Sequence, residues 1–191
     1  MGGVHPHISR TPEPPYTAVI FTSSRNPGDH GYEHMSTRMD QRAREQPGYL
    51  GHESMLYRDL TVRQNLQFHA RLHGVDPAQA ERALAAVGLA HRADDPVREL
   101  SRGMVQRAAV ARATLHDPKL LLLDEPRANL DPAAAEALEP LIGKPSGRTR
   151  VIASHDVESA LAEADLALGL KAGRQVFAGT TDVAAVRELY R

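Results

Sequence analysis

The chain has 191 residues, of which 41% are hydrophobic and 25% charged, and this is the composition of a soluble globular protein long enough to bury a core. Its net charge is −1 with the histidines neutral, so we expect no general attraction to nucleic acid or to an anionic membrane. The absence of cysteine excludes disulfides, thiolate zinc sites and cysteine nucleophiles, and the sequence shows neither a signal peptide nor a membrane-spanning apolar run, so we expect a cytoplasmic protein without direct membrane insertion.

The first part of the chain predicts a tail followed by a β-α-β segment. Residues 1–15 combine Pro, Gly and His without periodicity, and we expect a disordered tail in which His5 and His7 are solvated, a metal site being the alternative. Aromatic and β-branched residues favour strands, Asn-Pro and Gly favour loops, and methionines spaced at i, i+4 favour a helix. The elements expected here are a strand over 16–22, a loop over 23–31, a helix over 32–45 and a strand over 48–52.

Capping signals predict helices in the middle of the chain. Thr61 followed three residues later by Gln64 is a capping box, and Asp76 followed by proline is an N-cap with proline in the first turn. These two helices and a third one are expected over 61–73, 76–87 and 104–115. Together they predict a helical subdomain over about 61–115.

Strands alternate with helices in the C-terminal half. The four consecutive leucines Leu120–Leu123 suit a strand buried on both faces of a parallel sheet. The other elements expected are a helix over 131–141, a strand over 150–153, a helix over 156–163, strands over 166–171 and 174–178, and a helix over 182–190. This alternation predicts an α/β fold with a mostly parallel sheet.

Two adjacent carboxylates, Asp124 and Glu125, directly follow the leucine strand. At the carboxyl end of a parallel strand, one carboxylate can hold Mg²⁺ and the next can polarise a water for attack on a phosphate. A buried strand followed by an N-capping acid is the structural alternative, and the carboxylate pair alone does not decide between them.

Three further motifs favour phosphate chemistry. Ser101 and Gly103 stand just before a predicted helix and would present a hydroxyl and backbone N–H groups to an anion, although Ser101 alone could be only a helix cap. Asp131 ends the string Ala-Asn-Leu-Asp that follows the carboxylates, and His155 ends the next strand. A lone histidine at a strand end is usually structural, but this position relative to the Asp-Glu strand favours contact with a γ-phosphate.

With these motifs in order, residues 48–191 resemble the ATP-binding subunit of ABC transporters, and are most similar to bacterial exporter ATPases, including those of haem export in cytochrome c maturation. Leu100–Met104 resembles the signature motif, Leu120–Glu125 the Walker B motif, Ala128–Asp131 the D-loop and His155 the switch histidine. The resemblance implies ATP and Mg²⁺ as cofactors, a transmembrane permease as partner, head-to-tail dimers of ATPase domains, and a position peripheral to the inner membrane.

The resemblance also implies residue roles. Asp124 would bind Mg²⁺, Glu125 would polarise the attacking water and His155 would contact the γ-phosphate. Ser101 and Gly103 would contact the γ-phosphate held by the opposite subunit. The residues implied at the dimer interface and in the Q-loop are Asp131 and His52, and the histidine stands where the family usually carries glutamine.

The phosphate-binding loop of the family, G-x-x-x-x-G-K-[ST], does not occur in this sequence. The only Gly-Lys pair is Gly143-Lys144, which is followed by proline and lies beyond Glu125. Losing about four hydrogen bonds to phosphate at ~1.5–3 kcal/mol each removes ~6–12 kcal/mol, against ~8 kcal/mol for a whole micromolar site. We therefore expect little ATP affinity, and the loop over 23–31 is a poor substitute because it lacks lysine and contains Asp29.

Residues 16–54 resemble the first half of an antibiotic-biosynthesis-monooxygenase-type protein, whose ferredoxin-like fold pairs into a dimeric α/β barrel. The resemblance is carried by residues 18–23, 27–32 and 46–54. The chain would then be a natural fusion or a gene-assembly product that joins near 48–54, with an incomplete P-loop-NTPase-type sheet in its second part. The strand over 16–22 could fill the place beside the leucine strand. Otherwise the leucine strand would have an exposed edge, and we expect the chain to be marginally stable.

Three functions remain open at this stage. The first is an ABC-type ATPase subunit, and the second is a non-hydrolysing module or remnant that keeps the permease-docking helical subdomain. The third is a monooxygenase-like small-ligand-binding protein, which half a barrel makes the weakest of the three. The transported substrate cannot be read from the sequence, because in this family the permease selects it.

Overall fold

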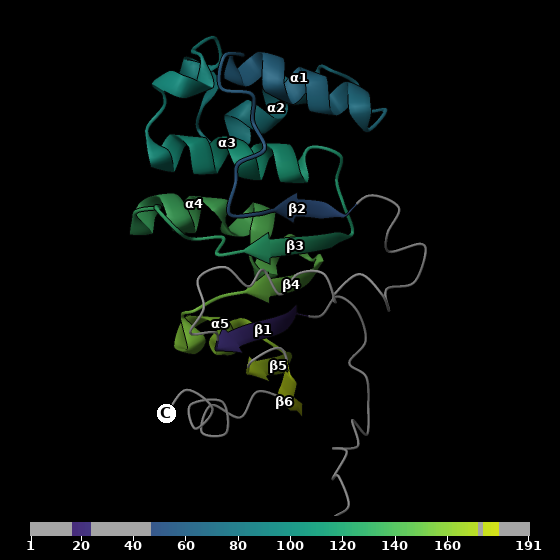
Figure 1. Ribbon diagram of the computed structural model, residues 1–191. Helices are drawn as coiled ribbons and strands as arrows, with labels where there is room; N and C mark the ends of the chain where they lie inside the picture. The colour runs from purple at the N-terminus through teal and green to yellow at the C-terminus, as the bar shows by residue number, and fades with distance from the viewer. Residues whose placement is uncertain (1–16, 24–46, 172–173, 180–191) are drawn as a thin grey trace, which may run out of the picture.

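The computed structural model describes residues 17–23, 47–171 and 174–179 (Figure 1). Three expected elements therefore lie outside the described residues: the N-terminal tail, the helix over 32–45 and the helix over 182–190. Most of the loop over 23–31 lies outside them as well.

A single six-stranded sheet forms the centre of the fold, in the order β2-β3-β4-β1-β5-β6. Neighbouring strands run parallel except β5 and β6, which are antiparallel. The strands are β1 Thr17–Ser23, β2 Gly48–Leu50, β3 Leu120–Asp124, β4 Thr149–Ala153, β5 Leu166–Lys171 and β6 Arg174–Gly179. This confirms the α/β class and the mostly parallel sheet.

The leucine strand β3 is paired along both sides, which corrects the expectation of an exposed edge. Leu121 to Leu123 pair with Gly48 to Leu50 of β2, and all of β3 pairs with β4. Strand β1 does not flank β3; it lies one strand further, between β4 and β5. The expectation was wrong because it placed the missing strand beside β3, whereas β2 covers one side and β4 the other.

Three helices gather beyond the β2 end of the sheet, as Figure 1 shows at the top of the view. They pack against one another, and α3 also contacts β2 and α4. The helices and short 3₁₀ turns are α1 Val62–Leu72, α2 Gln79–Ala86, η3 Ala90–Arg92, η4 Val97–Glu99, α3 Arg102–Thr114, α4 Pro132–Ile142, η5 Lys144–Ser146 and α5 Val157–Glu163.

The capping predictions hold closely. Thr61 and Gln64 form the reciprocal capping box at α1, with Thr61 Oγ1 accepting from the Gln64 amide at 3.1 Å. The second helix begins at Gln79 and not at the start of the expected range 76–87, because the Asp76 carboxylate caps a turn at the Ala78 amide before α2 starts. Strand β2 ends at Leu50, earlier than expected.

The buried core runs through the middle of the sheet and into the three-helix group. Leu121, Leu123 and Ile152 of adjacent strands are buried together with Val19 of β1 and Leu66 of α1. Within the described ranges, no helix combines the length and apolar character needed to cross a bilayer. Because the strands of the core run parallel, their carboxyl ends lie at one shared edge of the sheet, where the candidate site is found.

Candidate functional site

The ends of β3 and β4 bring the predicted acidic residues and the histidine to one edge of the sheet. Asp124 is the last residue of β3 and pairs with Ala153, the last residue of β4. The Glu125 amide continues the pairing by donating to the Ala153 carbonyl at 2.9 Å. The backbone of β4 thus delivers His155 next to Glu125.

Glu125 and His155 are in direct contact. Glu125 Oε1 lies 2.6 Å from His155 Nδ1 and accepts a second hydrogen bond from the His155 backbone amide, also at 2.6 Å. The Glu125 side chain is 28% exposed and the His155 ring 86% exposed, so the pair lies at an open surface. The hydrogen bond to Glu125, reinforced by its charge, raises the pKa of His155 above its ordinary value.

The backbone after β3 turns sharply, which the strand prediction did not anticipate. Glu125 has φ 48° and Asn129 has φ 61°, both in the left-handed region that non-glycine residues seldom adopt. The Glu125 carbonyl accepts from the Ala128 amide at 3.0 Å. The Asp131 carboxylate then caps α4 by accepting from the Ala134 amide at 2.8 Å.

The start of α3 packs against this turn. Ser101 caps α3 by accepting from the Met104 amide at 3.3 Å, as the cap interpretation expected. A Cβ at Gly103 would come within 3.1 Å of the Asn129 carbonyl oxygen, so this glycine allows the helix to approach the turn closely. Gln106 strengthens the contact by donating to the Pro126 carbonyl at 3.2 Å.

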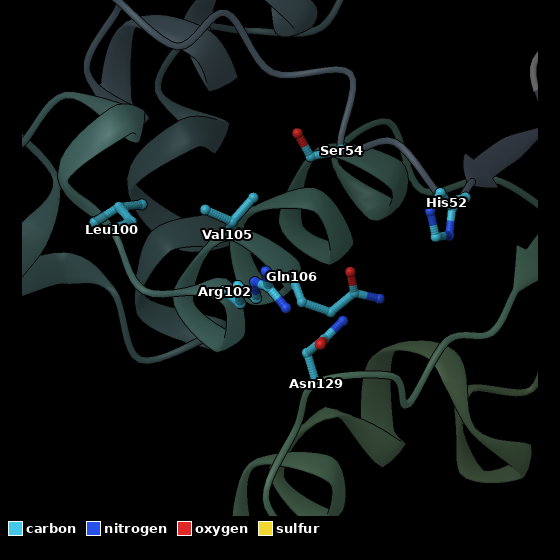
Figure 2. Close-up of a pocket in the computed structure, with 7 residues that line it drawn as sticks. All are labelled: His52, Ser54, Leu100, Arg102, Val105, Gln106 and Asn129. Carbon is cyan, nitrogen blue, oxygen red and sulfur yellow. The ribbon is translucent and has the colours of Figure 1, made fainter.

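A pocket of about 220 Å³ lies between the start of α3, the turn after β3 and the loop after β2. Figure 2 shows its lining, to which His52, Ser54, Leu100, Arg102, Val105, Gln106 and Asn129 contribute. His52 is exposed, on the loop that leaves β2. The mostly buried Arg112 of α3 holds this loop at both ends, donating to the Tyr49 carbonyl at 2.6 Å and to the Ser54 carbonyl at 3.2 Å.

Five of the seven predicted site residues fall into two neighbouring groups, while Asp131 caps α4 and His52 lies on the loop after β2. Glu125 and His155 touch each other beside Asp124, whereas Ser101 and Gly103 begin the helix that packs on the turn. The sequence did not indicate the roles of Arg127, Arg150 and Glu163, which join the turn after β3 to β4 through ion pairs. Their only sequence signal is the set of opposite charges, which by itself does not show which residues meet.

The donor set fits a magnesium ion that is bound together with a phosphate ligand. Within the described ranges, no three His, Cys, Asp or Glu residues are clustered so as to hold a metal by themselves. Asp124 offers one half-buried carboxylate at the sheet edge. Mg²⁺ is commonly held by one or two carboxylates together with substrate phosphates and waters, so a single protein carboxylate is compatible with such a site.

Together, the mostly parallel sheet, the carboxylates at its edge and the adjoining helical group have the architecture of a nucleotide-binding domain. The family model described as ABC transporter matches residues 22–128, so the chain belongs to this family. The match begins at residue 22, earlier than the start near residue 48 that the motifs indicated. It therefore includes part of the segment that was also interpreted as monooxygenase-like, a resemblance that stays a prediction.

Two relatives illustrate the similarity. The chain is 38% identical over 146 residues to a Nod factor export ATP-binding protein of Burkholderia orbicola, covering 72% of this chain and 47% of that protein. It is 42% identical over 114 residues to a cytochrome c biogenesis ATP-binding export protein of Cupriavidus metallidurans, covering 58% of this chain and 54% of that protein. The chain thus spans about half the length of each.

A solved structure supports the fold. The chain superposes on a structure described as an ATP binding subunit of an ABC transporter, with a TM-score of 0.75. The superposition covers 92% of this chain and 86% of the solved chain at 24% sequence identity. The arrangement of strands and helices in this chain is therefore that of an ABC ATP-binding subunit.

Proposed function

We propose that this chain serves as an ATP-binding subunit of an ABC transporter whose γ-phosphate-facing residues are assembled but whose own affinity for Mg-ATP is weak. The observation that carries the proposal is the contact of Glu125 with His155 at the carboxyl edge of the sheet. A carboxylate and an imidazole in this place can orient a water and contact a terminal phosphate. Membership of the ABC transporter family supports a nucleotide as the ligand of both groups.

The proposed roles follow the geometry of the edge. Asp124 would hold Mg²⁺, which neutralises charge on the phosphates when it is bound. Glu125 would accept a hydrogen bond from the attacking water, and the raised pKa of His155 favours a protonated ring that can donate toward phosphate oxygen. His52, on the loop beyond β2, would approach the same space from the other side of the pocket.

The weak affinity for Mg-ATP is expected from the segment that follows β1. Strand β1 ends at Ser23 on the edge that carries Asp124, so the loop after it starts where a phosphate cradle is needed. That loop has no Gly-Lys-Ser or Gly-Lys-Thr string. Without the lysine and the glycine-rich turn, most of the charge-assisted hydrogen bonds to the β- and γ-phosphates are lost.

The proposal includes two partners. Ser101 and Gly103 would face the nucleotide of a second ATPase domain in a head-to-tail dimer, with Asp131 at the interface. The helical group α1 to α3 would dock onto a transmembrane permease, which places the chain at the inner face of the membrane. A subunit that docks but does not hydrolyse ATP is the second candidate, which the missing phosphate loop favours.

Titration calorimetry of the whole chain with Mg-ATP tests the proposal. We expect a Kd of roughly 1 mM, which corresponds to a binding free energy of about −4 kcal/mol. Glu125→Gln should bind slightly more tightly if the edge residues face ATP, because one negative charge is removed beside the phosphates. Glu136→Gln, an exposed glutamate of α4, is the matched control.

Micromolar, saturable binding by the unmodified chain would contradict weak affinity and mean that the segment after β1 rebuilds a phosphate cradle. Complete absence of heat at millimolar ATP for both the chain and Glu125→Gln would reject nucleotide binding. In that case the docking role alone would remain.

A further inference from the structure

Arg127 ties the turn that carries Glu125 to two helices. Its guanidinium pairs with Glu139 of α4 at 2.7 Å and with Glu163 of α5 at 2.7 Å. The Arg127 side chain is 40% exposed, whereas that of Glu163 is only 13% exposed. The turn is therefore anchored to a partly buried carboxylate and not only to a surface ion pair.

Glu163 connects Arg127 to the sheet. Its second oxygen lies 2.7 Å from Arg150 of β4, whose side chain is 1% exposed. Burial by itself would raise the pKa of Glu163, but hydrogen bonds from Arg127 and Arg150 outweigh it and leave the pKa below its ordinary value. Glu163 is thus anionic at neutral pH, and one carboxylate bridges the site turn to a buried cation.

The connection also reaches the element that carries His155. Helix α5 begins at Val157, and its N-cap Asp156 directly follows His155. Arg127 therefore links the residues after Glu125 to the helix after His155. Glu125 follows β3 and His155 follows β4. The ion pair of Arg127 with Glu163 joins the segment after β3 to the helix α5 that follows β4.

Glu125 needs such a restraint because of its backbone. Its φ of 48° lies in the left-handed region, which is unfavourable for a non-glycine residue because Cβ comes too close to the following carbonyl oxygen. A free turn would relax away from it and carry the carboxylate off His155. A fork of hydrogen bonds to two fixed carboxylates opposes that relaxation.

We propose that Arg127 is a positioning residue, which holds Glu125 against His155 through its ion pairs with Glu163 and Glu139. This rests on the proposed function only in treating Glu125 and His155 as the reacting pair. The positioning itself exists in the nucleotide-free chain and can be measured there.

The test is Arg127→Met in the full chain, followed by nuclear magnetic resonance of His155, whose signals are assigned by their loss in His155→Gln. Removing a nearby cation would by itself raise the pKa of His155, since the protonated ring is then repelled less. Losing the contact with Glu125 would lower it. We expect the pKa to fall toward the ordinary histidine value, and the His155 amide resonance to lose the downfield shift caused by its short bond to Glu125.

Arg63→Met is the matched control, since Arg63 also bridges two carboxylates, Glu81 and Asp94, but in the helical group. It should leave both His155 signals unchanged. Arg127→Lys keeps the charge without the two-armed geometry and should give intermediate signals, which also covers the case that the methionine variant does not fold.

A raised or unchanged His155 pKa in folded Arg127→Met, with an unchanged amide resonance, would overturn the proposal. This outcome is distinct from failure of the proposed function. Absence of Mg-ATP binding would reject the function while leaving the nucleotide-free resonances able to support or reject the positioning role.

Discussion

Arg150 and Thr17 are 133 positions apart in the sequence and are joined by a hydrogen bond of 2.7 Å from Arg150 Nη2 to Thr17 Oγ1. Arg150 is 1% and Thr17 2% exposed, so the bond lies inside the sheet where β4 meets β1. A buried guanidinium requires a counter-charge, and Glu163 supplies it. The ion pair of Arg150 with Glu163 thus supports a buried hydrogen bond between β4 and β1, in addition to the backbone pairing of the two strands.

Glu163→Ala should destabilise the chain by about 3–5 kcal/mol, because it leaves the Arg150 charge buried without a partner. The free energy of unfolding in urea, read by circular dichroism, measures the loss. The double variant Arg150→Met with Glu163→Leu should recover most of it, because removing both charges also removes the desolvation cost. Glu136→Ala is the surface control, expected within about 0.5 kcal/mol of the unmodified chain. A loss at Glu163 no larger than that of this control would show that the ion pair is not required.

The Glu125–His155 pair predicts a pH dependence of stability. The pKa of His155 is raised in the folded chain, so its stabilising contribution is fully present below the unfolded pKa near 6.5 and is lost as the pH rises through the folded pKa. The difference in unfolding free energy between the chain and His155→Gln should therefore shrink from pH 6 to pH 8.5. Burial lowers the pKa of His69 and His73, whose effect has the opposite sign but cancels in this difference. A difference that stays constant across this range would argue against the pair.

Asn65 holds the segment that leads into α1. Its side chain is fully buried, accepts from the Tyr57 amide at 2.7 Å and donates to the Tyr57 carbonyl at 3.0 Å and the Thr61 carbonyl at 2.9 Å. Asn65→Ala should cost about 1–3 kcal/mol for each backbone group left unsatisfied. Thermal unfolding compared with the exposed Arg71→Ala in the same helix measures it. Equal melting temperatures for the two variants would contradict this role.

Local signals were the most predictable part of the structure. Thr61 and Gln64 define a cap within four residues, and Leu120–Leu123 define a buried strand by composition alone. The placement of Glu125 and His155 at one edge could be predicted because both follow strands whose carboxyl ends meet there, whereas their direct contact was not predicted. The distance between the two residues is set by the register of β3 and β4.

Long-range order was harder to predict. Strand order depends on which buried faces pack together, and the sequence of β1 does not indicate that it lies between β4 and β5. Arg150 stands at the start of a predicted strand, where a charged residue is expected to be exposed. It is buried because Glu163 of the following helix neutralises its charge. The left-handed φ of Glu125 is likewise imposed by the turn and not by residue preference.

The position of β1 has a consequence for how the chain is made. Both neighbours of β1, the strands β4 and β5, are synthesised more than a hundred residues later. As the chain leaves the ribosome, β2 and the helical group can begin to assemble while β1 still lacks both partners. The pairings of β1 with β4 and β5 can therefore form only late in synthesis, which favours slow folding and leaves an apolar strand accessible to chaperones or to other chains in the meantime.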